Sequence, residues 1–180
     1  MCDRWREEKK IKIISLEEKK KVLILLKEWL GPFRLILGSR GEAFMEEEIF
    51  ELVKFASKID IITSVTSNGF LIDKTMAEKI VSSGLNHLVI SLDGIDEKTH
   101  DWVRGVKGSF QRIQRAIELL NKDRGGMSLL INSIIMEQNL DQLVDLVKLV
   151  GKKGLDGIFF LQLESKFHFL PPLRGAGARS

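Results

Sequence analysis

The chain has 180 residues, of which 44% are hydrophobic and 29% charged, and its formal net charge is +3. These values are typical of one globular domain with a single core. The sequence lacks a basic patch with interleaved aromatic residues, which argues against nucleic-acid binding. It also lacks an apolar run near the roughly 20 residues that a membrane span needs, which argues against membrane insertion.

The N-terminus and the cysteine content indicate the cellular compartment. Arg4, Glu7 and Lys9 lie where a secretory signal peptide would carry an apolar stretch. The only cysteine, Cys2, excludes an intramolecular disulfide. We therefore expect a cytoplasmic protein in a reducing compartment.

The first half of the chain alternates predicted helices with short apolar strands. Ser15 and Glu18 form a capping-box pair that predicts a helix ending near Leu30. The elements predicted next are a strand over 33–37, a helix over 46–57, a strand over 61–66, and a helix capped by Asp73 and ended by Gly84.

The second half continues the same alternation. The predicted elements are a strand over 87–92, a longer polar insertion, a helix over 109–121, a strand over 129–136, a helix over 140–150 capped by Asn139, and a strand over 158–163. The near-continuous apolar sequence of the last strand favours burial on both faces. A short edge strand over 9–14 is a further expectation.

This rhythm predicts an α/β fold with about five strands alternating with helices in a parallel sheet. A closed eight-stranded barrel needs about 250 residues, so we expect a partial, open β/α barrel of the TIM type. A doubly wound sheet is the alternative. We expect an incomplete core domain over 1–166 and an irregular tail over 167–180, which lacks periodicity.

Small and polar residues follow the predicted strands at their carboxyl ends, where parallel β/α folds bind ligands. These segments are 38–42, 67–69, 91–94, 137–139 and 162–164. Each has an ordinary explanation as a turn. Glu42 is harder to explain in this way, because it lies between Gly41 and the apolar Ala43-Phe44-Met45. The pattern alone predicts a β/α enzyme that binds a polar small molecule.

The strand-end segments resemble motifs of radical S-adenosylmethionine (radical SAM) enzymes. Ser91-Leu92-Asp93-Gly94, followed by His100-Asp101, Arg104-Gly105 and Gly108-Ser109-Phe110, resembles the signature after the fourth strand and is the most specific match. Thr66-Ser67-Asn68-Gly69 resembles the Thr-Asn-Gly turn of that family with one extra residue. Ser39 to Phe44 resembles its Gly-Gly-Glu-Pro motif.

The N-terminus resembles the end of the family's cysteine loop, Cys-x-x-x-Cys-x-x-Cys, which binds a 4Fe–4S cluster. By this resemblance Cys2 would be the last cluster ligand. The reduced cluster would pass an electron to S-adenosylmethionine, and the resulting 5′-deoxyadenosyl radical would take a hydrogen atom from a substrate. The resemblance implies a ferredoxin or flavodoxin as reductant, and leaves open whether the substrate is a small molecule or a peptide.

The resemblance also implies residues that bind S-adenosylmethionine. Gly41 and Glu42 would lie beside its methionine amino group, and Asn68 would line the same rim. Ser91 and Asp93 would contact its ribose or carboxylate.

Arg104 has two possible roles by the same resemblance. It would either pair with the methionine carboxylate or anchor its own loop. His100 belongs to the motif as well, and we expect it to stabilise the loop.

The sequence departs from the family pattern in several places. Only one of the three cysteines is present, and the strand expected before their loop is absent. Arg40 replaces the first glycine of Gly-Gly-Glu, and Ala43 replaces its proline. We therefore expect a core truncated inside the cluster motif, and we predict that this chain alone does not catalyse radical chemistry.

Two other interpretations stay open. A non-catalytic descendant would bind a nucleotide-like ligand or a partner protein. An unrelated β/α fragment that binds phosphate would need a glycine-rich loop between a late strand and a helix, whereas Gly151 and Gly154 follow a predicted helix. A reading frame that continues before Met1, with cysteines three and seven residues before Cys2, favours the enzyme.

Overall fold

The computed structural model describes residues 14–38 and 41–162. Within them, five strands form one sheet whose order follows the chain: β1 (Arg34–Leu37), β2 (Ile62–Ser67), β3 (His87–Ser91), β4 (Ser128–Ile135) and β5 (Gly157–Gln162). Each neighbouring pair is parallel. A doubly wound sheet reverses its strand order at a switch point, so that alternative is excluded.

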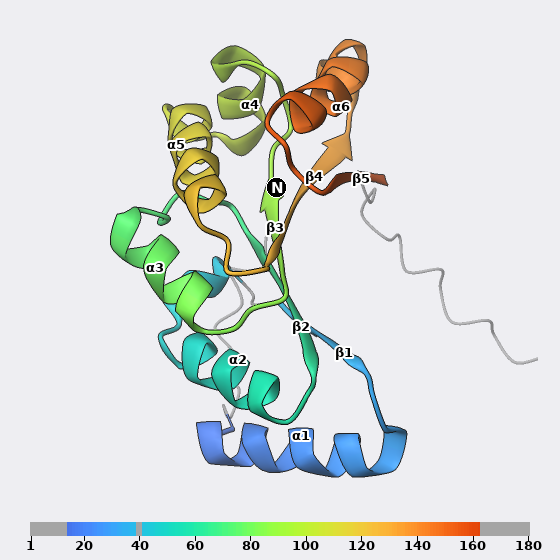
Figure 1. The fold of residues 1–180 in the computed structure, drawn as a ribbon. Helices are drawn as coiled ribbons and strands as arrows, with labels where there is room; N and C mark the ends of the chain where they lie inside the picture. Colours follow the sequence, from blue (N-terminus) through green and yellow to red (C-terminus); the bar gives the residue numbers. More distant parts are fainter. Residues whose placement is uncertain (1–13, 39–40, 163–180) are drawn as a thin grey trace, which may run out of the picture.

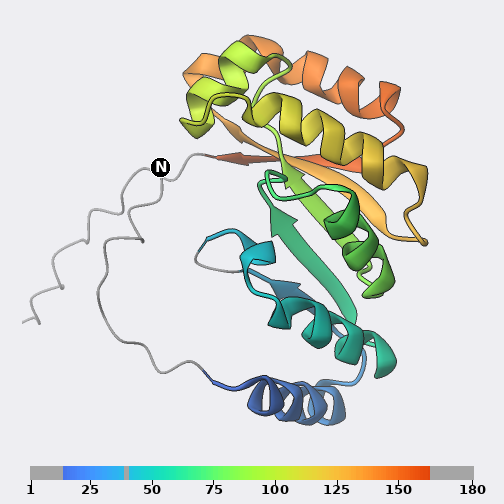
Figure 2. The same cartoon turned by 90° about the vertical axis from the view of Figure 1, so that its left-hand side faces the viewer.

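The helices lie along one side of the sheet. They are α1 (Leu16–Leu30), α2 (Glu48–Lys58), α3 (Lys74–Ser82), α4 (Glu97–Arg104), α5 (Ser109–Lys122) and α6 (Leu143–Lys152), with the 3-10 helices η2 (Ala43–Met45) and η3 (Glu137–Gln142). Helix α1 precedes β1, and the others lie between successive strands. The sheet curls, and the helices lie on its convex side (Figures 1 and 2). The predicted partial, open β/α barrel is therefore confirmed.

The hydrophobic core lies between the convex face and the helices. Side chains alternate between the two faces of a strand, and the set that includes Leu88, Ile90, Leu129 and Ile131 is buried against the helices. The other set is more open, and Ile36 is 71% exposed. The helices thus leave the concave face as the side of the sheet that a ligand can reach.

The burial predicted for the last strand is wrong. Phe159 is 51% exposed and Leu161 is 46% exposed. Among the described strands β5 pairs with β4 alone, so no neighbour covers its other edge. An apolar sequence shows that a strand can be buried on both faces, but it does not show where that strand lies in the sheet.

The local capping signals are confirmed. Ser15 and Glu18 form the predicted capping box at the start of α1. Asp73 caps α3 by accepting a hydrogen bond of 2.8 Å from the backbone N–H of Met76. Gly84 follows α3 with a φ of +79°, a conformation that favours glycine.

Two local predictions between β3 and α6 are wrong. The stretch expected to be a polar insertion contains α4, which Asp96 caps. Asn139, expected to cap a helix, lies inside η3 and is fully buried, and α6 begins at Leu143. The difference at Asn139 has a tertiary cause, because its side chain donates to the carbonyl of Asp93, 46 positions away in the sequence.

The remaining predictions about the ends of the chain fall on residues that the structure does not describe. These are Cys2, all but the last residue of the strand over 9–14, and the boundary between the core over 1–166 and the tail over 167–180. In the described part, no helix is long and apolar enough to cross a bilayer.

Candidate functional site

Glu42 connects the carboxyl ends of β1 and β2. Its Oε1 accepts hydrogen bonds from the Ser67 hydroxyl at 2.6 Å and from the Phe44 N–H at 3.4 Å. Its Oε2 accepts one of 2.7 Å from the backbone N–H of Asn68. A carboxylate offers about four acceptor positions, and the donors within the described residues occupy three of them, so Oε2 keeps one position with respect to this part of the chain. The carboxylate is therefore fixed at this edge and can still bind a ligand.

The turn after β2 is shaped by short-range bonds. The Ser67 hydroxyl accepts from the Gly69 N–H at 2.9 Å, and the Asn68 side chain accepts from the Phe70 N–H at 2.9 Å. Gly69 has a φ of +72°, and a Cβ there would lie 3.1 Å from Cγ1 of Ile113. Glycine is thus required by its backbone and its surroundings. The turn holds Asn68 against Glu42.

Gly41 and its neighbours complete the loop after β1. Gly41 is exposed, and a Cβ at this position would meet no atom of the described residues within 4 Å, its two chain neighbours apart. The described part of the chain therefore leaves space at Gly41. Arg40, which departs from the family pattern, lies outside the described residues.

Ser91 ends β3 and is paired with Asn132 of β4 in the sheet. Because Ile90 and Ile131 face the helices, Ser91 and Asn132 face the concave side. Oδ1 of Asn132 is buried and has no hydrogen-bond partner within 14–38 and 41–162. A buried acceptor without a protein partner suits a ligand hydroxyl. Asn132 was missed by sequence reasoning, although an amide in a strand as apolar as β4 was a usable signal.

Asp93, two residues beyond Ser91, is fully buried. Its Oδ1 accepts a hydrogen bond of 2.8 Å from the Ile134 N–H, and its carbonyl accepts one of 2.9 Å from Nδ2 of Asn139. Oδ2 lies 2.7 Å from Nε of Arg104, a charge contact without hydrogen-bond alignment. The Asp93 carboxylate therefore faces protein groups rather than the open edge where sequence reasoning expected it.

His100 completes this cluster from α4. Its Nδ1 accepts a hydrogen bond of 3.1 Å from the Asp93 N–H, and its Nε2 has no partner in the described part of the chain. Burial, followed by the positive charge of Arg104, lowers the pKa of His100 to about 4, although Asp93 and Asp101 act in the opposite direction. The imidazole is thus neutral at neutral pH, with its proton on Nε2.

Asp101, the neighbour of His100, closes the loop before α5. Its carboxylate accepts from the N–H groups of Gly108 and Phe110 and from the Ser109 hydroxyl. Burial raises the pKa of Asp101, but these hydrogen bonds outweigh that effect and hold it below its ordinary value. The motif residues after β3 therefore form an internal network.

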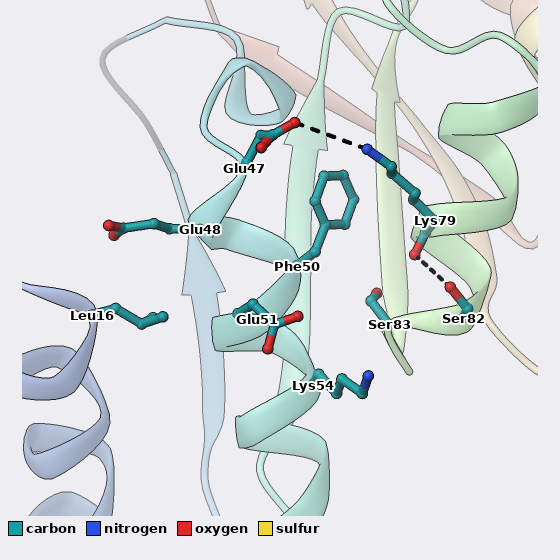
Figure 3. Close-up of a pocket in the computed structure, with 9 residues that line it drawn as sticks. All are labelled: Leu16, Glu47, Glu48, Phe50, Glu51, Lys54, Lys79, Ser82 and Ser83. Carbon is teal, nitrogen blue, oxygen red and sulfur yellow. Dashed lines mark hydrogen bonds and ion pairs between the residues drawn. The ribbon is translucent and has the colours of Figure 1, made fainter.

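A groove of about 450 Å³ lies elsewhere, in the helix layer between α1, α2 and α3 (Figure 3). Phe50 and Lys54 line it, and Glu47 and Lys79 form an ion pair of 3.9 Å across it. None of the described residues expected at the site lines this groove. The candidate site is therefore the sheet edge and not the groove.

Taken together, the structure places the described site residues around one edge of one sheet. Glu42 and Asn68 are in direct contact, and Ser91 follows on the neighbouring strand. Asp93 and Arg104 lie behind them as an ion pair. Polar groups at the carboxyl ends of parallel strands lie where β/α barrels bind their ligands, so this edge is the candidate site of a partial β/α barrel core.

Sequence comparison gives the family. The model of the radical SAM superfamily matches residues 1–150. The chain therefore belongs to the radical SAM superfamily.

Curated relatives agree with this assignment. The Fe-coproporphyrin III synthase of Methanosarcina barkeri is 32% identical over 150 residues, which cover 83% of this chain and 36% of that protein. The AdoMet-dependent heme synthase of Oleidesulfovibrio alaskensis is 30% identical over 141 residues, 78% of this chain and 35% of that protein. The chain thus spans about a third of the length of these relatives.

Solved structures share the fold. SuiB of Streptococcus suis bound to S-adenosylmethionine has a TM-score of 0.69 and 22% identity, covering 91% of this chain and 37% of that one. SuiB bound to precursor peptide SuiA has a TM-score of 0.68 and 21% identity, and the match covers 88% of this chain and 35% of that one. At this identity the likeness establishes the fold.

Proposed function

We propose that this chain is the S-adenosylmethionine-binding core of a radical SAM enzyme. The observation that carries the proposal is the Glu42 carboxylate, which Ser67 and Asn68 fix at the sheet edge and in which the described residues leave one acceptor position unused. A carboxylate in this place complements the ammonium group of the methionine moiety. Gly41, beside it, leaves room for that group to approach.

The neighbouring strands would bind the sugar. Ser91 offers a hydroxyl, and Asn132 offers a buried acceptor that has no partner among the described residues, both on the concave side. These groups can pair with ribose hydroxyls, and Asn68 would complete the rim. The donor set therefore fits S-adenosylmethionine. Arg104 contacts Asp93 in the structure, so we assign it the loop-anchoring role rather than a bond to the methionine carboxylate.

The residues of this chain do not fit the 4Fe–4S cluster. A cluster of the family's type uses three thiolates, and the sequence holds one cysteine, Cys2. Within the described ranges, no group of three His, Cys, Asp or Glu side chains can hold a metal ion. We therefore propose Cys2 as one ligand of three, and propose that this polypeptide alone does not perform radical chemistry.

A complete cluster, held by Cys2 and two further cysteines, would supply the electron that cleaves S-adenosylmethionine into methionine and a 5′-deoxyadenosyl radical. The residues of the chain bind and orient the cofactor at the edge formed by β1, β2 and β3. The substrate would be a small molecule or a peptide, since the relatives include heme synthases and a structure bound to a precursor peptide. A ferredoxin or flavodoxin would deliver the electron.

The alternative function is a non-catalytic module that binds a nucleotide-like ligand. The single cysteine favours it for this polypeptide. Both functions require the same proposed ligand pocket, which consists of Glu42, Asn68, Ser91 and Asn132 at the edge of the sheet. They differ in whether radical chemistry follows once all three cluster cysteines are supplied.

Calorimetric titration with S-adenosylmethionine tests the pocket. We expect Glu42→Gln to weaken binding about tenfold, since it removes the charge that complements the ammonium group. Glu47→Gln is the matched control, because the Glu47 side chain is 92% exposed and lies in the helix-layer groove. Equal affinity of the Glu42→Gln and Glu47→Gln variants would contradict the proposal.

A further inference from the structure

Each polar group of Asp93 makes a hydrogen bond or a charge contact. The residues that contact it belong to several segments of the chain. The backbone N–H contacts His100, the carbonyl contacts Asn139, and the carboxylate contacts Ile134 and Arg104. The partners belong to α4, β4 and η3. Because Asp93 is fully buried, a ligand at the sheet edge cannot reach its carboxylate without breaking these contacts.

A second set of hydrogen bonds, made by Gln142, holds the same segments together. Gln142 at the end of η3 donates to the Asp96 carboxylate at 3.0 Å and to the Thr99 hydroxyl at 2.8 Å, and it accepts from the Ile95 N–H at 3.0 Å. The exit from β3 also passes close under α4, since a Cβ on Gly94 would lie 2.8 Å from Cβ of Thr99. The segment from β3 through α4 is therefore tied to β4 and η3 at several points.

From this geometry we propose that Asp93, His100 and Arg104 are positioning residues for the pocket. Asp93 joins the carboxyl end of β3 to β4, and His100 and Arg104 of α4 hold Asp93 in place. Together they fix the relative position of Ser91 and Asn132, which face the ligand. The inference rests on the proposed function for its ligand. It assigns Asp93, His100 and Arg104 of this motif to holding the pocket together, whereas Ser91 of the same motif contacts the cofactor.

His100 is the most informative member of the group. It can accept from the Asp93 N–H only with an unprotonated Nδ1. An asparagine side chain carries an acceptor oxygen near the place of Nδ1, whereas leucine has nearly the same shape without the acceptor. His100→Asn and His100→Leu therefore differ in the one property that the proposal requires.

The test compares these variants in the full chain by amide hydrogen exchange and by titration with S-adenosylmethionine. We expect His100→Leu to speed exchange of the Asp93 amide at least about tenfold and to weaken binding about tenfold. We expect His100→Asn to restore both values to within about twofold of the wild type. Equal binding of all three proteins, with only the melting temperature changed, would show a merely structural role and overturn the proposal.

Asp93→Asn gives an independent comparison if both His100 variants fail to fold. It keeps an acceptor for the Ile134 N–H but removes the charge that faces Arg104. We expect affinity for S-adenosylmethionine to fall about tenfold, and unchanged affinity would overturn the proposal. If the wild-type chain binds no S-adenosylmethionine, the proposed function fails, while the exchange rates of the Asp93 and Ile134 amides still test the joining of β3 and β4.

Discussion

The hydroxyl of Ser67 donates a hydrogen bond of 2.6 Å to the carboxylate of Glu42, and this bond joins the loop after β1 to the end of β2. The two residues are 25 positions apart in the sequence. The same carboxylate accepts from the backbone of Asn68. Glu42 therefore shapes the edge of the sheet as well as offering a charge to a ligand.

Removing this carboxylate should reduce stability. We expect Glu42→Ala to lower the free energy of unfolding by roughly 1–3 kcal/mol, because it leaves the Ser67 hydroxyl and the Asn68 N–H without their acceptor. Glu47→Ala should change it by less than about 0.5 kcal/mol, since an exposed ion pair contributes little. Urea denaturation measures both values, and equal effects would contradict the arrangement of the edge.

The Gly69 turn should not tolerate a side chain. Gly69→Ala adds a Cβ 3.1 Å from Ile113 in a backbone with a φ of +72°. Gly154→Ala is the control, because its φ is +64° and, its chain neighbours apart, no atom of the described residues lies within 4 Å of the added Cβ. Both variants bear the cost of a left-handed conformation, about 1–2 kcal/mol. Thermal denaturation should show the larger loss for Gly69→Ala, and an equal loss would mean that the contact with Ile113 is unimportant.

Asn132 should favour ligand binding at the expense of stability. Asn132→Leu replaces a buried acceptor that has no partner within the described residues, so we expect stability to be unchanged or to rise by about 1 kcal/mol. Affinity for S-adenosylmethionine should fall in the same variant. Calorimetry and urea denaturation of one preparation measure both effects, and a stable variant with unchanged affinity would remove Asn132 from the proposed site.

Stability should depend on pH through His100. Its pKa in the folded state, about 4, lies below its ordinary value of 6.5, so the unfolded chain binds more protons between these values. Stability is therefore complete above pH 6.5 and falls as the pH drops to about 4, by on the order of 3 kcal/mol. His100→Asn should remove this dependence.

The carboxylates should affect stability at lower pH values than His100 does. The pKa values of Glu18, Asp96 and Asp101 are also lowered, from 4.5, 3.8 and 3.8, so the stability that they contribute is lost only as the pH falls below those values. Urea denaturation between pH 7 and pH 4.5 thus isolates His100. A flat profile in this range for the wild-type chain would contradict a buried, neutral imidazole.

Short-range signals allowed much of the fold to be predicted from the sequence. The capping box at Ser15, the cap at Asp73 and the polar residues at the strand ends depend on neighbours within a few positions. The helix α4 was missed because its sequence, EKTHDWVR, has too few apolar residues for a helical period. Its single tryptophan, Trp102, is 64% exposed.

The burial of Asp93 could not be predicted in the same way. Its partners Ile134 and Asn139 are 41 and 46 positions away, and only the parallel pairing of β3 with β4 brings them close. The exposure of β5 likewise depends on its place at the sheet edge. The sequence suggested that Glu42 and Asn68 lie on the same rim, whereas it did not predict their direct hydrogen bond or the bond from Ser67 to Glu42.

Formation of 5′-deoxyadenosine tests the central claim most directly. The chain should be compared anaerobically, after reconstitution with iron and sulfide, with a version extended before Met1 so that cysteines stand three and seven residues before Cys2. We predict no stable 4Fe–4S absorbance and no 5′-deoxyadenosine from the chain as it is, and both from the extended chain given S-adenosylmethionine and a reductant. A full cluster in the extended chain without 5′-deoxyadenosine would contradict the account, as would 5′-deoxyadenosine from the chain with one cysteine.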